Sequence, residues 1–165
     1  MDTKSIFKNK AAFKGFSYGL TSGVITTLGV MIGVHFTTHS RIAVIAGIVA
    51  IAIADSFSDA LGIHISEEAE KQTDIAKIWA STLFTLLSKF FFTLTFLIPI
   101  LLFSIDIALV ISIIWGFSLL ILLSGYLAKQ EGVHLRGVIA EHLSIAILVV
   151  VITYFATILI DALKK

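Results

Sequence analysis

The chain of 165 residues contains no cysteine, one proline and few charged side chains. Without cysteine there are no disulfides, thiolate metal ligands or cysteine nucleophile. Charged residues make up 14% of the sequence, against roughly 25% in soluble domains. A net charge of +1, with no cluster of basic and aromatic residues, gives no sign of a nucleic-acid partner. No P-loop, dinucleotide-binding or hydrolase motif is present, and we expect no enzyme.

The sequence contains several long apolar runs, and its mean hydropathy is +1.02. About 20 apolar residues are needed to cross a bilayer as a helix. The runs predict an all-α polytopic membrane protein, one domain over residues 1–165, with five transmembrane helices. The expected spans are 15–36, 42–65, 82–103, 107–128 and 138–160, the third broken near Pro99. We interpret the basic N-terminal stretch as leading into a retained first span, not as a signal peptide.

Basic residues at the span ends predict the orientation, because cytoplasmic loops are enriched in lysine and arginine. With the N-terminus inside, the inner side carries Lys4, Lys8, Lys10, Lys14, Lys71, Lys77, Lys129 and Arg136, and the outer side Arg41, Lys164 and Lys165. The sequence therefore favours N-in and C-out, and we expect a prokaryotic plasma membrane. Lys89 is left out of the count; we expect it near the inner end of the third span, with its stem snorkelling to the headgroups.

Two aspartates inside the second span, Asp55 and Asp59, are the strongest functional signal. Their i, i+4 spacing places both carboxylates on one helix face. An ionised carboxylate at mid-bilayer costs about 2.5–3.5 kcal/mol, so such a pair needs a cavity, a shared proton or a cation. Oxygen ligands suit a hard or borderline divalent ion such as Mn²⁺ or Fe²⁺. The alternative is a structural or protonated pair through which no ion passes.

Other polar residues are candidates to assist this pair. Ser22 and Thr26 on the first span offer hydroxyls, and His64 and Glu141 are possible proton carriers or secondary ligands. Glu67, Glu70 and Asp74 would share one helical face and gather cations at the inner mouth. The same acidic run is equally consistent with a solvated helix start capped by Ser66.

Glycines recur at four-residue spacing along the first span, at Gly15, Gly19 and Gly23 and again at Gly29 and Gly33. This spacing lets two helices approach closely in lipid. We therefore expect either a plain helix-packing face or, because five short spans make a thin bundle, the interface of a homodimer.

Two segments, residues 19–34 (GLTSGVITTLGVMIGV) and residues 53–70 (IADSFSDALGIHISEEAE), have recognisable patterns. They resemble the first and second transmembrane helices of the vacuolar iron transporter family. Pro99 and the segment GYLAKQEGVHLRGVIAEHL extend the resemblance over nearly the whole chain. The resemblance implies a five-helix, N-in metal transporter. Asp55 and Glu70 coincide with acidic residues that the family often has.

The chain departs from the family pattern at the expected metal site. Ser22 stands where the family has a first-helix aspartate, and Asp59 where it has a methionine. Ile63 and His64 replace its glutamate and tyrosine, and residues 66–81 are too short for its cytoplasmic metal-binding region. A carboxylate in place of a thioether makes the site harder, which favours Mn²⁺, Mg²⁺ or Ca²⁺ over Fe²⁺.

These observations predict a homodimeric divalent-cation transporter in the lipid bilayer, coupled to protons. The metal ion would be its substrate, with no permanently bound cofactor. The alternatives are a non-transporting sensor or assembly protein on the same scaffold, and an intramembrane enzyme with an aspartyl pair as acid and base.

Overall fold

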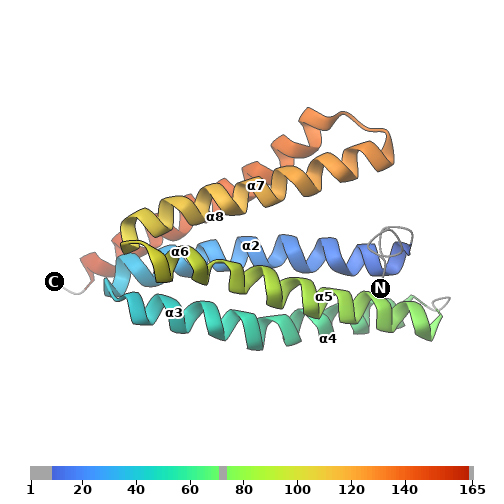
Figure 1. Cartoon of the computed structure of the whole chain (residues 1–165), viewed down its shortest axis with the longest axis horizontal. Coiled ribbons are helices and arrows are strands. Elements are labelled where there is room, and N and C mark those ends of the chain that lie inside the picture. The colour runs from blue at the N-terminus through green and yellow to red at the C-terminus, as the bar shows by residue number, and fades with distance from the viewer. Residues whose placement is uncertain (1–8, 71–73, 164–165) are drawn as a thin grey trace. The chain divides into compact units, whose positions relative to one another are not determined.

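The computed structural model describes residues 9–70 and 74–163, and all regular structure in these residues is helical. Five helical segments are long and apolar enough to cross a membrane: Lys10–Thr38, Arg41–Ala69, Ile75–Leu102, Ile105–Gln130 and Leu135–Ala162. Figure 1 colours them from blue to red along the chain. The predicted five-span, all-α fold is thus confirmed, and the protein is an integral membrane protein.

Side-chain caps explain where the first two helices begin. The Asn9 side chain accepts hydrogen bonds from the backbone N–H groups of Ala11 and Ala12 at the start of α2 (Lys10–Thr38). The hydroxyl of Ser40 accepts from Ala43 N–H at the start of α3 (Arg41–Ala50). These contacts satisfy N–H groups that have no partner inside the first turn of a helix.

Two irregular turns interrupt the second and third spans. The second continues from α3 through one π-helical turn, η1 (Ile51–Asp55), into α4 (Ser56–Ala69). The third consists of α5 (Ile75–Thr95) and α6 (Leu97–Leu102), separated at Phe96. Pro99 explains this break, since proline clashes with the carbonyl four residues earlier, that of Thr95. The break predicted near Pro99 is confirmed.

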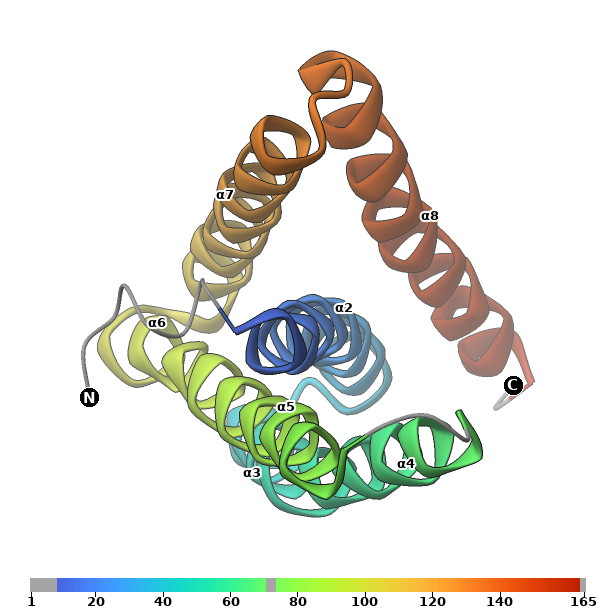
Figure 2. The ribbon, with the colours of Figure 1, turned by 90° about the vertical axis from the view of Figure 1, so that its right-hand side faces the viewer.

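The last two spans are continuous helices, α7 (Ile105–Glu131) and α8 (Leu135–Ala162). Gly132 ends α7 in the left-handed conformation, with φ of 67°, and the N–H of Val133 donates to the carbonyl of Ala128. This is the usual way in which a glycine terminates a helix. Figure 2 shows the tight connection that follows between α7 and α8.

The helices form two compact units. Among the described residues, the first contains 9–23, 49–70 and 74–95, and the second contains 24–48 and 96–163. In the first, α4 lies along α5, as both views of the ribbon show. In the second, α7 packs against α6 and α8.

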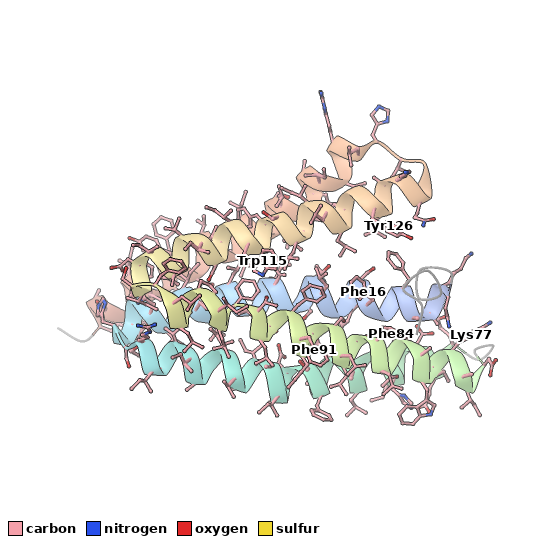
Figure 3. The ribbon with its side chains drawn as sticks, in the orientation of Figure 1. Phe16, Lys77, Phe84, Phe91, Trp115 and Tyr126 are labelled. Atoms are coloured by element: carbon pink, nitrogen blue, oxygen red, sulfur yellow. The ribbon has the colours of Figure 1, made fainter. Side chains whose placement is uncertain are left out.

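In the first unit, helix α5 has a mainly polar buried face and an apolar exposed face. The inner face of α5 consists of Ile78, Ser81, Thr82, Thr85, Ser88, Lys89 and Thr93, all buried. The opposite face exposes Leu83, Leu87 and Phe91; Figure 3 labels Phe91 on this helix. Such a pattern suits a helix whose outer face meets lipid, because only the interior can satisfy polar groups.

The second unit has an apolar core. Val24 and Leu28 of α2 and Phe96 beside α6 are buried and approach Gly116 of α7, where a side chain would contact all three. Arg41 at the start of α3 donates to the carbonyl of Ile100 in α6.

Candidate functional site

Asp55 lies at the middle of the span Arg41–Ala69, and Asp59 lies one helical turn further along it. Asp55 is the last residue of the π-helical turn, and Asp59 lies in the first turn of α4. Turns of this kind are rare and occur often at functional sites. The side chains of Asp55 and Asp59 are 36% and 17% exposed, so both carboxylates are partly covered by protein.

Lys89 of α5 binds both carboxylates. Its Nζ atom lies 2.5 Å from Asp55 Oδ2 and 2.6 Å from Asp59 Oδ2, and its side chain is fully buried. Since one ammonium contacts both aspartates, the two share a helix face, as their i, i+4 spacing predicts.

Ser22 of α2 completes the cluster from a third helix. The Lys89 ammonium donates to Ser22 Oγ at 2.9 Å, and so contacts three acceptors in all. Tyr18, one turn earlier on α2, lies within electrostatic range of Asp55, Asp59 and Lys89. The cluster thus combines two acidic side chains and one basic side chain.

The prediction that Lys89 lies near the inner end of its span and snorkels to the headgroups is wrong. The helix begins at Ile75, seven residues before the predicted start, so Lys89 is at the middle of the span Ile75–Leu102. Its ammonium points into the protein, where the aspartates compensate its charge. Apolar residues on both sides of Lys89 were the signal that could have placed it there.

The expected acidic face of Glu67, Glu70 and Asp74 is also wrong. Helix α4 ends at Ala69, and Glu70 leaves the helical conformation with φ of −79° and ψ of 84°. Glu67 is buried and pairs with Lys14 of α2, with 2.6 Å between Lys14 Nζ and Glu67 Oε1. Asp74 precedes the next helix, α5, where its carboxylate accepts from the N–H of Ala76.

The remaining candidates lie apart from this cluster or in the second unit. His64 Nδ1 is 2.9 Å from Thr82 Oγ1, its Nε2 is 3.5 Å from Glu68 Oε1, and its ring packs edge-on against Trp79. Thr26 and Glu141 belong to the second unit. There Thr26 lines an open groove between α2 and α8, and Glu141 is exposed.

The glycines of α2 pack within the chain. A Cβ atom at Gly15 would overlap the carbonyl of Ser81, and one at Gly19 would overlap Ser88 and the Thr85 carbonyl. Gly23 is buried against Lys89 and Thr93. The prediction that these three glycines form a dimer interface is wrong, because α5 covers them.

The second glycine pair belongs to the other unit. Gly29 and Gly33 line the groove beside Val149 and Thr153 of α8. Their part in a dimer stays a prediction.

Among the described residues, no three histidine, aspartate or glutamate side chains come together in an arrangement that could hold a metal ion. Asp55, Asp59 and Ser22 bring three side-chain oxygen atoms around the Lys89 ammonium, which contacts all three. No protein-family model, curated protein or solved structure matches this chain.

Proposed function

We propose that this chain is a membrane transporter of a divalent metal cation, of the Mn²⁺ or Fe²⁺ type, which it exchanges for protons. The observation that carries the proposal is the Asp55–Lys89–Asp59 cluster at the middle of the membrane spans. With both carboxylates ionised and Lys89 protonated, the cluster has one net negative charge. Negative charge in a low-dielectric interior attracts cations.

The chemistry of the ligands supports a hard ion. Asp55, Asp59 and Ser22 present only oxygen atoms, which suit Mn²⁺, Mg²⁺ and Ca²⁺ better than softer metals. Two carboxylates neutralise one divalent cation. Protons compete with the metal for the same carboxylate oxygens, so metal binding and proton release are coupled without further machinery.

The family and the assembly are part of the same proposal. We propose a divergent member of the vacuolar iron transporter family, N-in and C-out, acting as a homodimer in a prokaryotic plasma membrane. The lysine and arginine distribution supports the orientation, the two family-like segments support the family, and the glycine pair Gly29 and Gly33 is left as a candidate for the dimer interface. Any dimer interface must lie elsewhere than on Gly15, Gly19 and Gly23, which pack against α5.

A second candidate function is a non-transporting sensor or assembly protein on the same scaffold. It is favoured by the contacts of Lys89, whose ammonium satisfies both aspartates without any added ion. In that case the cluster is a structural ion pair that holds α4 to α5.

A flux assay on the reconstituted protein separates the two functions. Purified protein in vesicles is tested with Mn²⁺, Fe²⁺, Co²⁺, Mg²⁺ and Ca²⁺, with and without a pH gradient. The transporter is expected to move at least one of these ions above empty vesicles and to respond to the gradient. Folded protein that moves none of them would favour the sensor or assembly protein.

A further inference from the structure

The ammonium of Lys89 is placed as a bound cation would be. It contacts Asp55, Asp59 and Ser22 at 2.5, 2.6 and 2.9 Å, and none of its side chain is exposed. An ammonium has three N–H donors, so these three acceptors saturate it. The site is therefore already filled by a cation that belongs to the protein.

We propose that Lys89 is a tethered competitor, which the transported ion must displace from Asp55 and Asp59 in each cycle. This inference rests on the proposed function. A metal ion and the ammonium cannot both lie between the same carboxylate oxygens, because two cations would then share one position. Lys89 thus sets the affinity of the site for the transported ion.

Hydroxyl groups on α5 near Lys89 are candidate acceptors for the displaced ammonium. Its stem of four methylene groups is flexible, and helical side chains lean toward the N-terminal end of their helix. In that direction α5 carries the buried hydroxyls of Thr85 and Ser88. Each donates its own proton to a backbone carbonyl and keeps lone pairs that can accept from the ammonium.

A tethered competitor has a consequence for transport. Two carboxylates and a hydroxyl in a low-dielectric site would hold a divalent ion strongly and release it slowly. Return of the Lys89 ammonium expels the ion. Removing the ammonium should therefore tighten binding and slow turnover, whereas a purely structural lysine would weaken binding when removed.

The test measures Mn²⁺ affinity of the purified full chain by titration calorimetry and Mn²⁺ flux in vesicles. Lys89→Gln is expected to bind Mn²⁺ at least tenfold more tightly and to transport it more slowly. Lys89→Arg keeps the charge, and its planar guanidinium can grip both carboxylates, so it is expected to bind Mn²⁺ at least tenfold more weakly. Lys77→Gln, an exposed lysine of the same helix that Figure 3 labels, is the control and should match the wild type.

The outcomes separate the two proposals. Wild-type protein that neither binds nor moves any metal would overturn the proposed function, and this inference with it. Wild-type protein that binds Mn²⁺, with equal or weaker affinity in Lys89→Gln, would overturn the inference alone. Lys89→Gln removes the counterion of two aspartates and could fail to fold. In that case the Mn²⁺ affinity of Lys89→Arg is the test, and an affinity equal to that of the wild type would contradict the competitor role.

Discussion

The ammonium of Lys89 lies 2.6 Å from Asp59 Oδ2, across a gap of 30 residues in the sequence. The contact joins α5 to α4 at the middle of the membrane spans and leaves no part of the lysine exposed. Removing one partner of such a pair leaves a buried charge uncompensated, which is much costlier than losing an exposed ion pair. The pair therefore fixes both the packing of the first unit and the charge of its candidate ion site.

Close packing of α2 on α5 predicts that Gly15→Ala destabilises the protein. The added methyl group would overlap the Ser81 carbonyl, which is backbone and cannot move away cheaply. Overpacking of this kind costs about 1–3 kcal/mol. Thermal unfolding in detergent is the measurement. Gly62→Ala is the matched control, because nothing lies within 4 Å of its added atom; equal melting temperatures for the two variants would contradict the α2–α5 contact.

The ion pair between Lys14 and Glu67 predicts a smaller loss of stability. Lys14→Met leaves the buried Glu67 carboxylate without its 2.6 Å partner. Since the lysine side chain is itself 46% exposed, solvent screens the pair, and we expect a loss of about 1–2 kcal/mol. Denaturant unfolding measures it. Lys10→Met, which removes an exposed lysine from the same helix, should have little effect; a loss as large as that of Lys14→Met would show that the pair contributes nothing.

The contacts of His64 predict that it is no metal ligand. One ring nitrogen faces Thr82 and the other faces Glu68, and the ring packs against Trp79. We expect His64→Ala to keep the Mn²⁺ affinity of the wild type within about twofold, an energy difference below roughly half a kcal/mol. Calorimetric titration checks this, with His142→Ala of the second unit as control. A tenfold loss of Mn²⁺ affinity in His64→Ala, but not in His142→Ala, would show that His64 is a metal ligand.

The fold was predictable because apolar length alone identifies a membrane helix. All five spans are confirmed, but the structure extends the third to Ile75, beyond Lys77 and Trp79. The predicted start at 82 excluded this polar beginning, and that error moved Lys89 from the middle of the span to its end. A lysine at a helix end needs no partner, so its pairing with the aspartates was missed.

The site was predictable only in part. Asp55 and Asp59 stand out because they are isolated acids in an apolar run, and their common face follows from helix periodicity. Helix periodicity does not predict the ion pair of Glu67 with Lys14. The spacing of Glu67 to Glu70 and Asp74 indicates a shared face only if one helix continues, whereas α4 ends at Ala69. Contacts between distant helices, such as Lys14 with Glu67, leave no local pattern in a single sequence.

Mn²⁺ uptake into vesicles, measured for Asp59→Asn and for the wild type, shows whether the aspartate pair is the ion site. The substitution keeps the size of the side chain but removes one of the two carboxylates. Asp106→Asn, an exposed aspartate at the start of α7, is the control for loss of charge alone. The account predicts metal uptake by the wild type and the control and none by Asp59→Asn, with all three proteins folded. Undiminished uptake by Asp59→Asn would contradict it and place the ion path elsewhere.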